Sequence, residues 1–81
     1  MRITVLFSGL LRPIAGVEKE ILEIPEGTTV NGLSGIIGKR YPDLPLEAEK
    51  TFFIINDQVS TGDQELSEGD RVRIFRLLAG G

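Results

Sequence analysis

The sequence predicts an α+β domain with two layers, in which one main helix packs on a mixed sheet of four to five strands. Three observations support this prediction. Strand-like segments rich in β-branched and apolar residues lie near both ends of the chain, one helical periodicity lies between them, and turn residues separate these segments. The chain has 81 residues, of which 41% are hydrophobic and 26% are charged, and this suits one globular domain with a modest core.

The N-terminal part of the chain is expected to form two antiparallel strands. Arg2–Ser8 alternates apolar with other residues and is rich in β-branched and aromatic side chains, which is typical of a strand with one buried face. Gly9–Gly16 connects it to a second strand over Val17–Ile24, and Pro13 limits the length of any helical turn in the connection. A short connection between consecutive strands favours antiparallel pairing.

The main helix is expected from Val30 to about Tyr41, where apolar residues recur at helical spacing. Thr29 is a suitable N-cap, because its hydroxyl can accept a hydrogen bond from a free N–H of the first turn. Pro42 follows the expected end of the helix.

This helix has an unusual feature, because Gly32, Gly35 and Gly38 lie inside it. At about 100° per residue, the three glycines fall on the side opposite the apolar stripe and are expected to face water. Each costs up to about 1 kcal/mol relative to alanine. Two interpretations stay open: a marginal helix that tolerates them, or a bare backbone surface that a partner approaches closely.

The C-terminal half is expected to supply the remaining strands. Asp43–Lys50 is read as a loop, and Thr51–Asn56 as a strand that is apolar on both faces and therefore central or covered. A turn at Asn56-Asp57 leads into a short strand at Gln58–Ser60. The final strand, Arg71–Leu77, follows another turn.

One face of the predicted sheet has no second layer to cover it. If the first and last strands are neighbours, Leu6, Phe75 and alternate residues of Phe52–Ile55 lie on that face, with Arg71 and Arg73 at the rim of the apolar patch. Such a patch suits protein docking. The alternative is that these are scattered surface apolar residues, which are common.

The composition argues against several classes of function. The chain contains no Cys and no His, so thiolate catalysis, the usual zinc ligands and the commonest general base are missing, and no metal site is expected. The net charge of −3 argues against general nucleic-acid binding. There is no phosphate loop, membrane-length apolar run or signal-peptide core, so a cytoplasmic protein without catalytic groups of its own is expected.

The chain ends in Ala79-Gly80-Gly81, which places the terminal carboxylate on two residues without side chains. A flexible, slim tail of this kind can enter a narrow channel and present its carboxylate to chemistry at the far end. This suggests that the protein is itself a substrate. By itself the ending is a weak signal, because small residues are common at frayed chain ends.

The order of strand, strand, helix, strand, short strand, strand and terminal Gly-Gly resembles the ubiquitin-like β-grasp proteins. Local features strengthen the resemblance, and they are Leu11–Gly16, Thr29-Val30, Tyr41-Pro42, Asn56 and the run Leu66–Phe75 before the tail. Together they resemble the prokaryotic sulfur carriers, namely the small subunit of molybdopterin synthase and the thiazole-forming carrier of thiamine synthesis. One departure is Arg76-Leu77, which stands where the molybdopterin-type carriers commonly have two prolines.

The resemblance implies a β-grasp domain over residues 1–77 and a flexible tail over residues 78–81. It implies that a partner similar to ubiquitin-activating enzymes adenylates the carboxylate of Gly81 with ATP, while the chain itself binds no cofactor. A persulfide donor then supplies sulfur to make a thiocarboxylate, which enters the large subunit of a molybdopterin synthase or an equivalent acceptor. Gly80 and Gly81 would pass into both active sites. The implied partner-binding residues at the end of the domain and the start of the tail are Arg76, Leu77, Leu78 and Ala79.

Three functions stay open at this point. The first is a sulfur carrier for molybdopterin or thiamine synthesis, at most the sulfur-donating small subunit of a synthase. The second is a ubiquitin-like modifier that is joined to lysines of target proteins through Gly81. The third is a β-grasp binding module whose tail has no chemical role.

Overall fold

The computed structural model describes residues 1–77, apart from the side chain of Ala48. Its elements follow one another in this order: β1 (Arg2–Phe7), α1 (Leu11–Ala15), β2 (Lys19–Glu23), α2 (Val30–Arg40), η1 (Ala48–Lys50), β3 (Thr51–Ile55), β4 (Gln58–Val59) and β5 (Arg71–Arg76). The predicted elements are therefore confirmed, with boundaries that differ by one or two residues. The turn of 3-10 helix η1 is an addition, because the sequence predicted only loop there.

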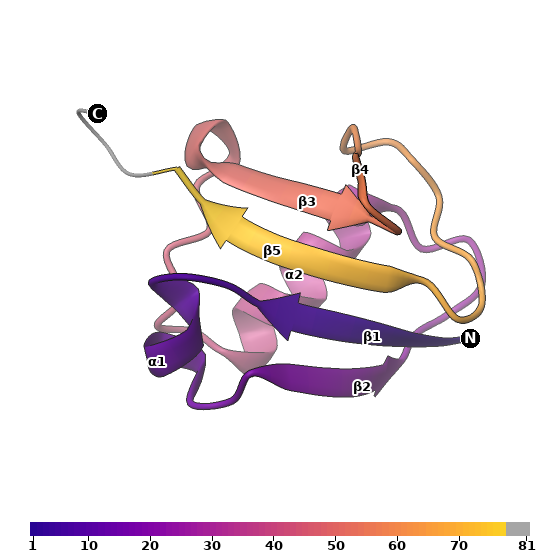
Figure 1. Ribbon diagram of the computed structural model, residues 1–81. Coiled ribbons are helices and arrows are strands. Elements are labelled where there is room, and N and C mark those ends of the chain that lie inside the picture. The colour runs from indigo at the N-terminus through magenta and orange to yellow at the C-terminus, as the bar shows by residue number, and fades with distance from the viewer. Residues whose placement is uncertain (78–81) are drawn as a thin grey trace.

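The strands form one mixed sheet in the order β2-β1-β5-β3-β4 (Figure 1). β1 pairs antiparallel with β2 and parallel with β5, and β3 pairs antiparallel with both β5 and β4. The centre of the sheet is therefore β5. The prediction of a central or covered Thr51–Asn56 strand is confirmed, because β3 pairs with a strand on each side and none of its residues is exposed, although only the two residues of β4 flank it on the outer side.

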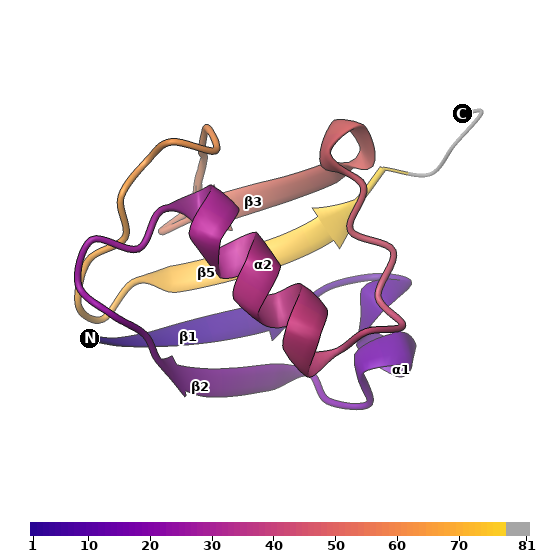
Figure 2. The same ribbon diagram turned by 180° about the vertical axis from the view of Figure 1, so that it is seen from behind.

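Helix α2 crosses one face of the sheet and leaves the other face open (Figures 1 and 2). The core lies between the two layers and is apolar. It consists of Ile3, Val5, Phe7, Leu11, Leu22, Ile24, Val30, Leu33, Ile37, Leu44, Phe53, Ile55, Leu66, Val72 and Ile74. The predicted strand faces and the helix stripe are confirmed. The helix stripe is buried, while Gly32 and Gly35 are exposed and Gly38 is half-buried on the opposite side.

The start of α2 satisfies its free N–H groups from two directions. The hydroxyl of Thr29 accepts a hydrogen bond from the backbone N–H of Gly32 at 3.2 Å, as the sequence predicted for the N-cap. The N–H groups of Val30 and Asn31 donate to carbonyls in the connection between β4 and β5, those of Gln64 (3.0 Å) and Gly62 (2.9 Å). The first turn of α2 is therefore tied to a segment far away in the sequence.

A polar cluster holds the other end of α2 against β2. Arg40 Nε donates to Glu20 Oε1 at 2.7 Å, and both Arg40 Nη2 and the hydroxyl of Tyr41 also donate to the Glu20 carboxylate. The hydrogen bonds from Arg40, together with the one from Tyr41, lower the pKa of Glu20. Burial raises the pKa of the Tyr41 hydroxyl. The ring of Tyr41 also packs edge-on against Phe7 of β1, with 5.1 Å between ring centres.

Within residues 1–77, the structure contains no helix that is both long enough and apolar enough to cross a membrane.

Candidate protein-docking face

The strand order brings residues from three strands into one row on the open face. Leu6 of β1 lies opposite Arg73 of β5, and Arg73 lies opposite Ile54 of β3. In the next row Phe75 lies opposite Phe52, and their rings stack with centres 5.6 Å apart. The prediction that the first and last strands are neighbours is confirmed, because β1 pairs with β5. This pairing brings the residues of the two rows together on one face.

The apolar and charged side chains of this face differ in exposure. Leu6, Ile54, Phe52 and Phe75 are half-buried, whereas Arg71 and Arg73 are exposed. This is the arrangement expected when apolar side chains pack along the sheet surface and the long arginine side chains extend past them to water.

The apolar surface extends to the edge strand. Ile21 of β2 is 61% exposed and lies opposite Thr4 of β1, which in turn lies opposite Arg71. An isoleucine this exposed contributes little to the core. It therefore adds to the apolar area that the open face presents.

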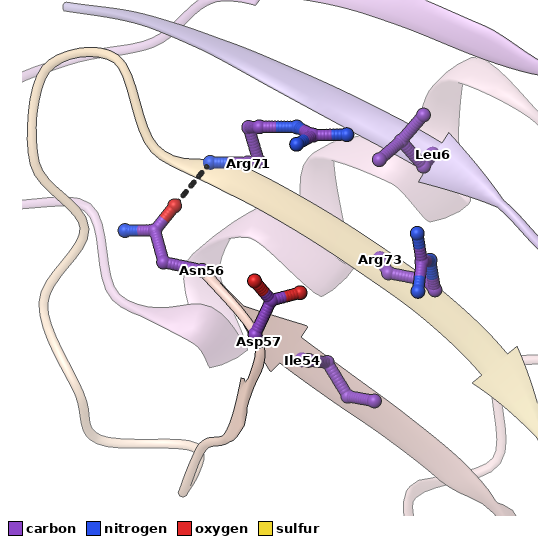
Figure 3. Close-up of a pocket in the computed structure, with 6 residues that line it drawn as sticks. All are labelled: Leu6, Ile54, Asn56, Asp57, Arg71 and Arg73. Atoms are coloured by element: carbon purple, nitrogen blue, oxygen red, sulfur yellow. Dashed lines mark hydrogen bonds between the residues drawn. The ribbon is translucent and has the colours of Figure 1, made fainter.

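A shallow hollow of about 180 Å³ lies on this face, and Figure 3 shows the side chains around it. They come from β1, β3, β5 and the turn after β3, and they are Leu6, Ile54, Asn56, Asp57, Arg71 and Arg73. Three of the residues that the sequence assigned to partner binding, Leu6, Arg71 and Arg73, thus surround one depression. Phe75 lies in the adjoining row.

Hydrogen bonds fix the position of Asn56 at the edge of this hollow. Its Oδ1 accepts from the backbone N–H of Arg71 at 3.0 Å, and its Nδ2 donates to Asp70 Oδ1 at 2.9 Å. Asp70, the one buried charged residue among those that the structure describes, also accepts from the backbone N–H of Ser67 at 2.8 Å. Asn56 and Asp57 both have positive φ, at 49° and 74°, as a two-residue type I′ hairpin turn requires.

The charge of this face differs from the charge of the whole chain. The chain carries −3 overall, yet Arg71 and Arg73 both extend from the open face. Neither of the two forms an ion pair with any acidic residue in the described part of the chain. Two unpaired guanidinium groups beside half-buried apolar side chains suit a protein surface that is apolar and acidic.

The base of the tail lies apart from this face. Arg76 lies on the helix side of the sheet, as expected for a residue of the same parity as Val72 and Ile74, and its Nη2 lies 2.6 Å from Glu47 Oε2. Leu77 is 56% exposed, and its N–H donates to the carbonyl of Lys50 at 2.8 Å. The other predicted tail residues, Leu78, Ala79, Gly80 and Gly81, lie outside the described residues.

Sequence reasoning missed three residues of this region. It gave no role in partner binding to Asn56 or Asp57, which line the hollow, and it treated Glu47 as part of a plain loop. The Asn-Asp pair signalled a turn, but only the pairing of β3 with β5 places that turn beside Arg71. Among residues 1–77, no group of three or more acidic side chains is placed to hold a metal ion.

Comparison with known proteins gives two sequence matches. The profile of the ThiS family matches residues 5–81. The molybdopterin synthase sulfur carrier subunit of Chlamydomonas reinhardtii is 32% identical over 83 residues, and the match covers the whole of both chains.

Solved structures share the fold. A Pyrococcus furiosus protein, provisionally described as molybdopterin converting factor subunit 1, superposes with a TM-score of 0.86 at 29% identity, over 96% of this chain and 99% of its own. A chain from the Helicobacter pylori complex of subunits 1 and 2 of molybdopterin-converting factor gives 0.68 at 21% identity, with both chains fully covered. The second likeness concerns the fold alone. The predicted β-grasp fold and the predicted resemblance to ubiquitin-like sulfur carriers are confirmed.

Proposed function

The chain belongs to the ThiS family, and from this premise we propose that it is the sulfur carrier subunit of a molybdopterin synthase. The match to the Chlamydomonas reinhardtii sulfur carrier subunit, which is 32% identical and complete over both chains, supports molybdopterin as the destination of the sulfur. It supports the thiamine pathway less, because the likeness to the molybdopterin protein extends through the whole chain.

The observation that carries the proposal is the position of β5. This central strand bears Arg71, Arg73 and Phe75 on the open face, and the chain then runs from Arg76 to its end at Gly81. One strand therefore joins a surface suited to recognition to a carboxylate suited to chemistry. An enzyme that docks on the open face holds the start of the tail close to its own surface, so the carboxylate reacts as an intramolecular group.

The proposed chemistry begins with activation. A carboxylate oxygen of Gly81 attacks the α-phosphorus of ATP, the bond between the α- and β-phosphates breaks, and pyrophosphate leaves. A persulfide sulfur then attacks the acyl carbon, and AMP leaves with the electron pair of the broken C–O bond. A thiol cleaves the resulting acyl disulfide, which leaves a thiocarboxylate on Gly81 and a new disulfide on the donor.

The partners supply all the catalytic groups in this scheme. An adenylating enzyme similar to ubiquitin-activating enzymes binds ATP, a sulfurtransferase carries the persulfide, and the large subunit of the synthase accepts the sulfur. The Helicobacter pylori relative was solved as a complex of subunits 1 and 2, and this supports a similar pairing here. Gly80 and Gly81, which have no side chains, let the tail enter both active sites. The cytoplasmic location of the protein stays a prediction.

Intact mass spectrometry tests this proposal. The full chain is incubated with ATP, an adenylating partner and a persulfide donor, and we expect a mass gain equal to the replacement of one oxygen by sulfur at Gly81. The matched control is the chain without Gly81, which should show no gain. An unchanged mass of the native chain would overturn the proposal, and conjugates of higher mass on a denaturing gel would favour a protein modifier.

The destination of the sulfur needs a second step. The thiocarboxylated chain is mixed with the large subunit of molybdopterin synthase and its precursor, and we expect the thiocarboxylate to return to a carboxylate. Turnover with a thiazole-forming system instead would move the assignment to the thiamine branch.

A further inference from the structure

Arg76 is held in an unusual way at the end of β5. Its side chain is 23% exposed, and Nη2 forms an ion pair with Glu47 Oε2 at 2.6 Å. Its Nε is buried and has no hydrogen-bond partner in the described part of the chain. The guanidinium has thus lost much of its contact with water and depends on one carboxylate for compensation.

Glu47 is itself fixed by the backbone around it. Its carbonyl accepts hydrogen bonds from the N–H of Lys50 at 3.0 Å and from the hydroxyl of Thr51 at 2.7 Å. Thr51 begins β3 and lies opposite Arg76 in the sheet. The carboxylate that holds Arg76 is therefore presented by a short segment that the sheet already anchors.

The same segment also holds the next residue of the chain. The N–H of Leu77 donates to the carbonyl of Lys50 at 2.8 Å. Arg76 is thus held through its side chain and Leu77 through its backbone, and both bonds lead to residues 47–50. Figure 2 shows this segment beside the C-terminal end of β5.

We propose that Glu47 and the Lys50 carbonyl form an anchor that sets where the reactive tail leaves the sheet, with Glu47 as a positioning residue for the Gly81 carboxylate. This inference rests on the proposed function. With the anchor intact, the described part of the chain is held as far as Leu77. Without the ion pair, the guanidinium of Arg76 loses the one carboxylate partner that it has among the described residues and moves out to water, which loosens the end of β5 next to Leu77 although the Arg76 backbone stays paired with Thr51.

The anchor and the docking face should affect different kinetic constants. Glu47 and Arg76 meet on the helix side of the sheet at the C-terminal end of β5, whereas Leu6, Arg71 and Arg73 line the hollow on the open face. Loss of the anchor leaves the docking contacts in place and lowers the effective concentration of the carboxylate in the partner's active site. Its effect should therefore fall on kcat, while KM for the carrier is preserved.

The test uses the full-length chain and the adenylating partner. We expect Glu47→Ala to lower kcat of ATP-dependent activation by about 3- to 10-fold with KM changed by less than about 2-fold. We also expect faster hydrogen exchange at the Leu77 amide. Arg76→Met removes the other partner of the ion pair but keeps an apolar side chain of similar length. It should lower kcat and speed hydrogen exchange at Leu77 in the same way.

The matched control is Glu23→Ala. Glu23 also forms an ion pair with an arginine, Arg2, at 2.9 Å, but does so between β1 and β2 at the opposite end of the sheet from the tail. It should leave kcat and the Leu77 amide unchanged. The double variant Glu47→Arg with Arg76→Glu restores an ion pair with reversed charges and should recover most of the lost kcat.

Two results would overturn the anchor. One is native kcat in Glu47→Ala and Arg76→Met, and the other is unchanged exchange at Leu77 in both variants. Failure of the proposed function looks different, because the native chain itself would then not be activated. In that case the Leu77 amide still decides whether the anchor exists.

Discussion

Leu6 lies directly opposite Arg73 on the neighbouring parallel strand, although the two residues are separated by most of the chain. On its other side Arg73 lies opposite Ile54. The aliphatic part of the arginine is therefore flanked by two apolar side chains, while its guanidinium is exposed to solvent. A single position on β5 thus combines apolar contact with a positive charge. This leads to two predictions, one for the charge and one for the apolar contact, and the dependence of each effect on salt concentration distinguishes them.

Replacement of Arg73 by Glu should weaken docking of the chain on the adenylating partner that we propose for it. We expect KM for the carrier to rise by about 10-fold at low salt and by less at high salt, because ions screen interactions between exposed charges. Lys39→Glu is the control. Lys39 is exposed on α2, so this substitution makes the same reversal of charge at a position away from the open face. Equal effects of the two variants would argue for general electrostatics and against a docking site.

Truncation of Leu6 to Ala should act through apolar contact. We expect KM to rise by about 3- to 10-fold, because the lost isopropyl group contributes about 1 kcal/mol or more to a buried contact. Unlike the effect of Arg73→Glu, this effect should not shrink at high salt. Leu10→Ala is the control, because Leu10 is 54% exposed just before α1. A KM that does not change in Leu6→Ala would remove Leu6 from the interface.

The cluster of Glu20, Arg40 and Tyr41 should make part of the stability depend on pH. The pKa of Glu20 is lowered in the folded state, mainly by its hydrogen bonds from Arg40. A lowered pKa means that the stabilisation is complete above the ordinary carboxyl pKa and is lost as pH falls through the lowered value. We expect Glu20→Gln to cost about 1 kcal/mol at neutral pH and progressively less in acid.

Urea unfolding between neutral pH and about pH 3 measures this difference. Glu23→Gln is the control, because Glu23 pairs with Arg2 at an exposed position and should cost less. A cost that stays constant down to the lowest pH would show that the charge of Glu20 is not what holds the end of α2 on β2.

Alanine at Gly35 or Gly38 should stabilise the protein. A Cβ at either position would meet no atom within 4 Å outside its own helix, so only the gain in helix propensity remains. We expect each substitution to raise the free energy of unfolding by up to about 1 kcal/mol. Gly32→Ala is the comparison, because its Cβ would lie 3.3 Å from the Thr28 methyl group and should gain less.

The same two variants decide between the two interpretations of these glycines. Gain of stability with unchanged activation by the partner means that the helix merely tolerates them. Gain of stability with loss of activation means that a partner approaches the bare backbone of α2.

The elements were predictable because each has one buried face. Alternation marked β1 and β5, and helical spacing with Thr29 marked α2, since these patterns reflect local geometry. The position of β3 was not predictable in the same way. Its run of apolar residues indicated cover on both faces, but on the open face that cover comes from stacking of Phe52 on Phe75, which depends on a strand more than twenty residues later.

The candidate site was predictable in part. Leu6, Arg71, Arg73 and Phe75 were named from strand parity, and the structure brings them to one face. The ion pair of Arg76 with Glu47 joins residues 29 positions apart, and no local pattern indicates it. Its existence depends on the pairing of β3 with β5, which brings the loop before β3 beside the end of the chain.

The sequence by itself determined the two layers and the apolar faces of the elements, because spacing and composition are properties of neighbouring residues. Only the tertiary structure decided which arginines extend from the open face and which one is held by an ion pair within the molecule. Arg71 and Arg73 extend from the open face, whereas Arg76 lies on the helix side against Glu47. The physical reason is that the odd or even position of a residue along its strand sets the face on which its side chain lies. The neighbours that the side chain meets on that face depend on long-range strand pairing.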